Sequence, residues 1–188
     1  MKTGKLVTLS VQNLVDCPVY RLYNMSTCAT GNYMHHAFEY VMANGIDTDQ
    51  SYPYIDGDNY KCLYDKRTVG ATISGYVNIT SGDELEMQRA VATVGPVTVG
   101  IDATTDGFRF YKSGVYKDTK HECKGQYFDE LHHAVTAVGY GTENGVHYWL
   151  LRNSYTTKYG DQGYMKMARN NNNQCGVATY ALYPTGVN

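Results

Sequence analysis

Hydrophobic residues recur with helical spacing in the first half of the chain and with alternating spacing in the second half. The first helical pattern ends at Gly45, a residue suited to a C-terminal cap. Its apolar face consists of Met34, Ala37, Phe38 and Val41. A second helix is predicted over residues 83–95, because acidic residues occupy its first turn and Gly95-Pro96 stops the pattern.

Beyond this point the apolar positions alternate, which predicts strands. The five expected strands, separated by turn residues, cover 96–103, 132–141, 146–155, 163–169 and 178–184. Asn144-Gly145 is the strongest hairpin signal among the turns. The pattern as a whole predicts an α+β protein with two lobes, a helical lobe over 1–95 and a β-rich lobe over 96–188.

Composition narrows the possible partners. The 188 residues are 43% hydrophobic and 18% charged, which is typical of a chain that folds around a core and not of a disordered one. A net charge of −2 gives no electrostatic footprint for nucleic acid. No apolar run approaches the roughly 20 residues of a transmembrane helix. Neither nucleic acid nor a membrane is therefore expected as a partner.

The five cysteines allow two interpretations. They are buried free thiols of a cytosolic protein, or two disulfides and one leftover thiol of an oxidising compartment. Two glycosylation sequons favour the oxidising compartment. In contrast, the first residues, MKTGKLVTLSVQNLVDC, lack the apolar core of a signal peptide. This combination predicts that the true N-terminus precedes Met1. The sequons are Asn24-Met25-Ser26 and Asn78-Ile79-Thr80.

No metal or cofactor is expected. The cysteines form no CxxC pair, and no His/Cys spacing fits a zinc site. The doublets His35-His36 and His132-His133 are weak candidates, because adjacent residues are expected to point apart on helices and strands.

His133 and Asn153 are the candidate chemical pair. If residues 141–145 form a five-residue loop, Tyr140 pairs with Val146 and His133 faces Asn153 across the sheet. A four-residue loop would place the two on opposite faces. A histidine held by an amide oxygen suits a general base, but a satisfied polar pair without catalytic function explains the spacing equally well.

Longer motifs make the resemblance specific. The segments LHHAVTAVGYG, YWLLRNSY and YGDQGYMKMARNNNNQCGVAT are similar to the second lobe of papain-family cysteine peptidases, above all the cathepsin K, S and L group. TGKLVTLSVQNLVDC, SYPY and AVATVGPVTVGIDA continue the match in order. The resemblance implies a papain-like two-lobe fold, with a partial helical lobe and an antiparallel, barrel-like β lobe.

In that family a cysteine thiolate attacks the peptide carbonyl, a histidine shares its proton and an asparagine orients the histidine. The resemblance assigns these last two roles to His133 in LHHAV and Asn153 in RNSY. It also implies disulfides Cys17–Cys62 and Cys123–Cys175, with Cys28 left as a free thiol.

The nucleophile matches no position of this sequence. The family's cysteine, in C-G-[SA]-C-[WY], stands about 130–150 residues before its His and Asn. The earliest cysteine, Cys17, stands 116 residues before His133 and lies in a disulfide context. We therefore expect that the nucleophile and the oxyanion segment are missing and that the chain is inactive as it stands.

The resemblance also implies substrate-binding positions, some of them altered. Tyr155 and Tyr159 replace the tryptophans that shield the His–Asn bond. The family's Gly-Gly substrate strand reads Ala29-Thr30-Gly31-Asn32, so only Gly31 is kept. A pocket for an apolar second residue of the substrate is expected. The binding positions are Gly31, Tyr33, Met34, Ala103, Leu131, Ala134, Tyr155 and Tyr180, with Tyr180 shortening the pocket floor if it points inward.

Two functions follow from the resemblance. The first is a truncated cathepsin-like endopeptidase whose full-length form is monomeric, lysosomal or extracellular, cleaves peptides or proteins and binds cystatin-type inhibitors. The second is a non-catalytic pseudo-peptidase that binds peptides or inhibitors in the groove that is kept. The reading frame upstream of Met1 would distinguish them.

Overall fold

The computed structural model describes residues 4, 6–18, 28, 31–59 and 61–188. The chain divides into two compact units, Met1–Val77 with Pro184–Asn188, and Asn78–Tyr183. The division predicted from sequence, at 95/96, lies inside the second unit and stays a prediction. The sequon at Asn24 lies outside the described residues, whereas Asn78 is exposed at the end of a strand.

The first unit is built around the predicted helix. Helix α4 (Met34–Asn44) ends at Gly45, whose φ of 84° lies in the region that favours glycine. Helix α1 (Val11–Asp16) and the strands β1 (Ile46–Asp47) and β2 (Val69–Ala71) also lie in this unit. The core of this unit comprises Cys17, Tyr40, Val41, Ile46, Tyr52 and Ile73.

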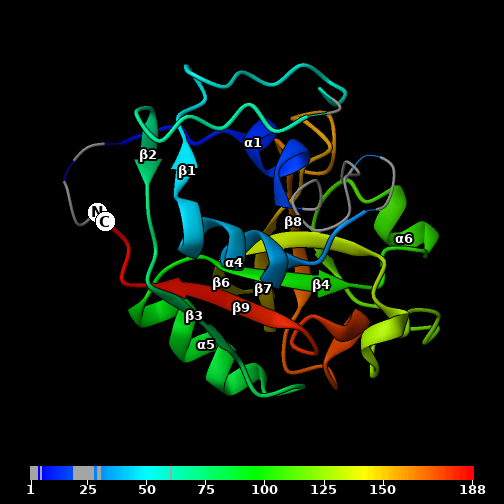
Figure 1. Cartoon of the computed structure of the whole chain (residues 1–188). Coiled ribbons are helices and arrows are strands. Elements are labelled where there is room, and N and C mark those ends of the chain that lie inside the picture. Colours follow the sequence, from blue (N-terminus) through cyan, green and yellow to red (C-terminus); the bar gives the residue numbers. More distant parts are fainter. Residues whose placement is uncertain (1–3, 5, 19–27, 29–30, 60) are drawn as a thin grey trace. The chain divides into compact units, whose positions relative to one another are not determined.

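A seven-stranded sheet contains the strand that begins at His133 (Figure 1). Its strand order is β3-β9-β4-β6-β7-β8-β5, with β5 parallel to β8 and the central pairs antiparallel. The strands are β3 (Gly75–Asn78), β4 (Val97–Ile101), β5 (Val115–Tyr116), β6 (His133–Glu143), β7 (Val146–Arg152), β8 (Tyr164–Ala168) and β9 (Ala181–Thr185).

This sheet confirms the α+β class but corrects the barrel-like expectation. The strands β3 and β5 are its two edges, so the sheet is open and is not closed into a barrel. Closure requires the edge strands to pair, and β5 has only two residues. The five strands predicted from alternation correspond to β4, β6, β7, β8 and β9.

The second predicted helix is α5 (Glu84–Thr93), which contributes Met87 and Ala90 to the core of the second unit. Asp83 caps it by accepting a hydrogen bond from the Glu86 backbone N–H at 2.8 Å. Shorter helices are α6 (Asp106–Arg109), η1 (Phe128–Glu130) and η2 (Gln174–Gly176). No described helix is long and apolar enough to cross a membrane.

The β6–β7 hairpin has a different turn from the one considered above. Glu143 pairs with Val146, so the loop is the two-residue Asn144-Gly145 turn. Both residues have positive φ, 50° and 78°, as such turns require. The five-residue loop is therefore wrong, and Tyr140 pairs with Trp149 instead of Val146.

Both disulfides implied by the resemblance are present. Cys17–Cys62 lies in the first unit and Cys123–Cys175 in the second. The fifth cysteine, Cys28, is free and exposed. On the chain-entropy model, closing loops of this length contributes about 4 kcal/mol each.

Candidate active site

His133 and Asn153 are joined by a hydrogen bond. His133 is the first residue of β6, and Asn153 directly follows β7. The His133 Nε2–H donates to Asn153 Oδ1 at 2.9 Å, and the Ser154 backbone N–H donates to the same oxygen at 2.7 Å. Because an amide oxygen only accepts, the proton is on Nε2. The other ring nitrogen, Nδ1, is therefore free to accept a proton.

The two residues meet although they are not direct cross-strand partners. A register shift between Ala137 and Gly139 moves the β6–β7 pairing by one residue, as a β-bulge does. The regular pairing ends at Thr136 and Arg152, before either residue is reached. Asn153 is held instead by its backbone N–H, which donates to Gly163 O at 3.0 Å.

The two ends of the Asn153 amide have different surroundings. The residue is 3% exposed, and its Nδ2 lies near the Tyr159 hydroxyl, where it lowers the pKa of that group against the larger effect of burial. The amide oxygen, in contrast, receives two donors. This asymmetry indicates that the residue serves the histidine.

Aromatic rings surround the pair. The Tyr155 ring lies 4.9 Å from the His133 ring, and Tyr159 meets Tyr155 edge-on at 5.6 Å. Tyr159 is 7% exposed, its hydroxyl donates to Phe108 O at 3.0 Å, and burial raises the pKa of that hydroxyl. Tyr155 is 48% exposed, so it covers the imidazole only partly. Of the two aromatic positions inferred from the resemblance, Tyr155 therefore lies beside His133 and Tyr159 packs against Tyr155.

Phe108 completes this aromatic group and was not singled out from the sequence. Its ring lies 5.9 Å from the His133 ring, edge-on, and it is 1% exposed. It lies in α6, a single turn whose N-cap, Thr105, accepts the Phe108 backbone N–H at 3.3 Å. The only signal in the sequence is this threonine three residues before the ring, which many surface turns share.

Three of the predicted substrate-binding residues gather around Gly100. Ala134 is its cross-strand partner, and a Cβ at position 100 would lie 3.1 Å from Leu131 Cδ1 and 3.5 Å from Tyr180 Cδ1. The Tyr180 ring packs edge-on against Phe128 at 4.8 Å. The absence of a side chain at Gly100 thus gives room to this apolar cluster. Ala103 is half-buried and follows β4 closely.

The sequence matches the papain family of cysteine proteases over residues 1–185. The chain belongs to this family. It is 50% identical to cathepsin S of Mus musculus over 185 residues, which cover 98% of this chain and 52% of the relative. It is 52% identical to cathepsin L of Sarcophaga peregrina over 186 residues, again 98% of this chain and 52% of the relative. The chain thus spans about half the length of these curated relatives.

The fold agrees with this assignment. The structure of digestive procathepsin L 3 from Tenebrio molitor larval midgut has a TM-score of 0.87 and 39% sequence identity, covering 98% of this chain and 57% of that one. Digestive procathepsin L2 from the same tissue has a TM-score of 0.86 and 43% identity, covering 97% and 54%. The papain-like fold expected from the motifs is confirmed.

The other predicted binding residues of this papain-family chain lie in the first unit. Gly31 is exposed with a φ of 68°, Tyr33 is the N-cap of α4, and Met34 is the first residue of that helix. Their role in substrate binding stays a prediction. Ala29 and Thr30 lie outside the described residues.

The histidine doublet at the start of α4 does not behave as expected. The His35 and His36 rings are 4.2 Å apart between centroids, so they do not point apart. His36 Nδ1 lies 2.8 Å from Asn32 Oδ1. Within the described part of the chain, no group of three or more His, Cys, Asp or Glu side chains is arranged to hold a metal ion.

Cys28, the free thiol, is expected to react slowly with iodoacetamide. Partial desolvation and the carboxylates of Asp58, Asp16 and Asp56 raise the pKa of its thiol. Since the thiolate is the reactive form, the midpoint of the pH–rate profile should lie above that of an ordinary cysteine. Asp58→Asn should move the midpoint down and speed alkylation at neutral pH, whereas Asp49→Asn should leave it unchanged. A wild-type midpoint below the ordinary value would contradict this prediction.

Proposed function

We propose that this chain provides the acid–base half of a cathepsin-like cysteine endopeptidase. The observation that carries the proposal is the bond from His133 Nε2–H to Asn153 Oδ1, which leaves Nδ1 as the proton acceptor. A thiol that gives its proton to Nδ1 becomes the thiolate that attacks a peptide carbonyl. The imidazolium then returns this proton to the leaving amine, and water hydrolyses the thioester. The Asn153 oxygen orients the ring and stabilises it while it carries the extra proton.

The nucleophile is the part of this reaction that the described cysteines do not supply. None of the five lies in a C-G-[SA]-C-[WY] motif. Four are in disulfides, and the surroundings of Cys28 disfavour its thiolate. We therefore propose that the 188 residues alone do not cleave peptides and that the thiol and the oxyanion donors belong to residues outside this sequence.

We further propose that the substrate carries an apolar second residue. Leu131, Ala134 and Tyr180 around Gly100 support this, since they offer an apolar surface. The bulk of Tyr180, with Phe128 behind its ring, favours a side chain of modest size. We also propose peptide and protein substrates, which the family match supports. Cystatin-type inhibitors, and a lysosomal or extracellular location for a monomeric full-length form, belong to the same proposal.

The test compares two proteins. One is the 188-residue chain; the other, the joined polypeptide, is the same chain extended at its N-terminus by a segment with the C-G-[SA]-C-[WY] motif from a papain-family relative. Each is incubated with fluorogenic peptides and with a thiol-directed epoxide. We expect turnover and stoichiometric labelling of the joined polypeptide alone. Its motif Cys→Ser variant serves as the control and should show neither.

Two outcomes would count against the proposal. Turnover by the 188-residue chain, lost on Cys28→Ser, would identify Cys28 as the nucleophile. A folded joined polypeptide that binds peptides but never turns over would favour the pseudo-peptidase. The second outcome has some support, because the apolar cluster around Gly100 does not depend on a nucleophile.

A further inference from the structure

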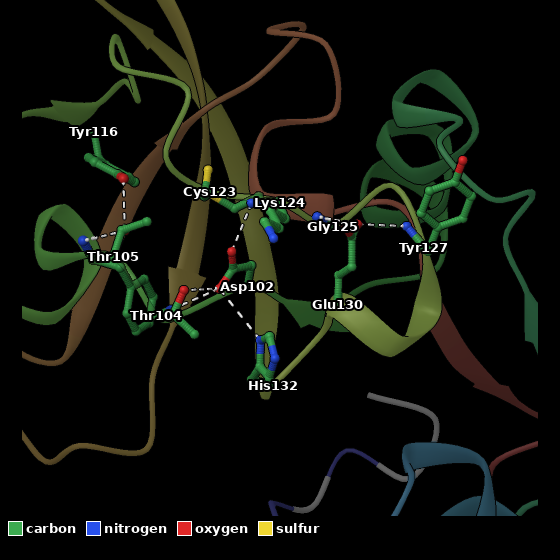
Figure 2. A network of polar contacts seen from close by, with 12 residues as sticks. Asp102, Thr104, Thr105, Tyr116, Cys123, Lys124, Gly125, Tyr127, Glu130 and His132 are labelled. Carbon is green, nitrogen blue, oxygen red and sulfur yellow. Dashed lines mark hydrogen bonds and ion pairs between the residues drawn. A yellow bond between two sulfur atoms is a disulfide. The ribbon is translucent and has the colours of Figure 1, made fainter.

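Asp102 is a buried carboxylate at the centre of a polar network (Figure 2). It is 2% exposed. Its Oδ1 accepts hydrogen bonds from the Thr104 backbone N–H at 2.9 Å and the Thr104 hydroxyl at 2.6 Å, and its Oδ2 accepts the Lys124 backbone N–H at 2.8 Å. His132 Nδ1 lies 3.5 Å from Oδ1. A buried carboxylate is tolerated only with such partners.

The network joins Asp102 to the backbone that carries His133. Asp102 directly follows β4, whose last residue, Ile101, is the cross-strand partner of His133. The His132 backbone N–H donates to Ile101 O at 3.0 Å, and the His132 ring contacts the Asp102 carboxylate. The His132 backbone is thus bonded to the end of β4, and its half-exposed ring lies within ion-pair distance of the carboxylate that follows this strand.

A second connection runs from Asp102 to the face of the His133 ring. The two bonds from Thr104 fix the start of the segment that leads into α6. The next residue, Thr105, caps α6, and its hydroxyl lies 3.0 Å from the Tyr116 hydroxyl (Figure 2). That helix carries Phe108, whose ring packs edge-on against His133. Asp102 is therefore connected both to the backbone before the imidazole and to the segment that carries the ring beside it.

The charge of Asp102 matters for these contacts. Burial alone would raise the pKa of its carboxyl group, but the hydrogen bonds from Thr104 and Lys124 and the nearby His132 lower it overall. The group is therefore ionised at neutral and mildly acidic pH, with both oxygens accepting. An asparagine at position 102 keeps the shape of the side chain but replaces one carboxylate oxygen by an NH₂ group. This donor would face the backbone N–H of Lys124 or of Thr104, so one hydrogen bond would be lost.

We infer that Asp102 is a positioning residue for His133, which acts by fixing His132 and the segment up to Phe108 so that the His133 ring meets Asn153 in a single orientation. The inference rests on the proposed function only for its kinetic consequence. The orientation itself can be measured in the 188-residue chain without any catalysis.

The first experiment follows the ring nitrogens of His133 by NMR in the ¹⁵N-histidine-labelled chain, with His133→Ala to assign the signal. In the wild type we expect one tautomer, with Nε2 protonated and its proton shielded from exchange by Asn153. Asp102→Asn should speed that exchange about fivefold to tenfold, as expected for the loss of one net hydrogen bond, and should mix the two tautomers.

Asp118→Asn is the matched control. Asp118, like Asp102, is a buried aspartate that accepts a hydrogen bond from the backbone of the segment 123–124. Its Oδ2 accepts the Cys123 backbone N–H at 2.8 Å. No contact between it and His132 or Thr104 is found among the described residues. This variant disturbs the same segment, 123–124, and should leave the His133 signal unchanged. If Asp102→Asn does not fold, His132→Ala replaces it, because the His132 side chain is half exposed and its loss should still speed the exchange.

The second experiment measures kinetics of the joined polypeptide. Asp102→Asn should lower kcat about tenfold to a hundredfold and leave KM unchanged, because a misplaced base slows chemistry and not binding. The inference is overturned if Asp102→Asn and His132→Ala both keep the wild-type ring signal, or if Asp118→Asn alters it equally. If every joined polypeptide is inactive while the ring signals change as expected, the proposed function fails and the positioning role stands.

Discussion

Alanine in place of His133 is expected to lower kcat of the joined polypeptide about 10²–10⁴-fold, the range that a general base contributes. Without the imidazole no group accepts the thiol proton, and no cation forms that can protonate the leaving amine. KM should change little, since the ring contacts the reacting atoms and not the remote parts of the substrate. Steady-state hydrolysis of a fluorogenic peptide, with active sites counted by epoxide labelling of the wild type, gives the comparison.

The control for this variant is His147→Ala. His147 lies in the same hairpin, is exposed, and its Nδ1 lies 2.8 Å from the Thr142 hydroxyl. It touches none of the residues proposed to act in catalysis, so its kcat should match that of the wild type. If His147→Ala lost as much activity as His133→Ala, the loss would reflect damage to the hairpin and not removal of the base.

Trp149→Ala is expected to lower the free energy of unfolding by about 3–5 kcal/mol, the usual cost of removing a large buried aromatic side chain. Trp149 is fully buried in the core of the second unit, and its indole N–H donates to Glu84 Oε2 at 2.9 Å. The substitution opens a cavity and also removes a donor from a buried carboxylate. Because this is the only tryptophan, urea unfolding must be followed by circular dichroism.

Tyr140→Ala is the matched comparison for Trp149. Tyr140 pairs with Trp149 across the hairpin, their rings meet edge-on at 6.0 Å, and Tyr140 is 38% exposed. Its loss should cost about 1 kcal/mol, the usual value of an aromatic pair. If both variants lost the same free energy of unfolding, the contact between the Tyr140 and Trp149 rings, and not burial of the indole, would account for the stability.

Local patterns were sufficient to predict the larger elements. The helix ending at Gly45 and the strands on either side of Asn144-Gly145 follow from periodicity and turn chemistry within short windows. The register of the hairpin was not predictable in this way. It depends on the two-residue turn and on the irregularity between Ala137 and Gly139. Such bulges arise from how a strand fits its neighbours, which no short window of sequence contains.

The candidate site was accessible from sequence only in part. His133 and Asn153 came from motifs, because their spacing alone allowed either face of the sheet. Asp102 and Phe108 were missed because their importance lies in contacts between distant segments, such as the bond between Asp102 and Lys124. An aspartate after a strand resembles an ordinary turn residue until those contacts are known.

The placement of the acid–base pair at the open end of one hairpin has a consequence for how the protein folds. His133 and Asn153 are only 20 residues apart in sequence, and β6 and β7 pair directly through a two-residue turn. Closing a short loop costs little chain entropy, and isolated hairpins form within microseconds. The hairpin therefore brings the ends of its two strands near each other through local contacts, and the slower pairing with Ile101 and Gly163 completes the placement of His133 and Asn153.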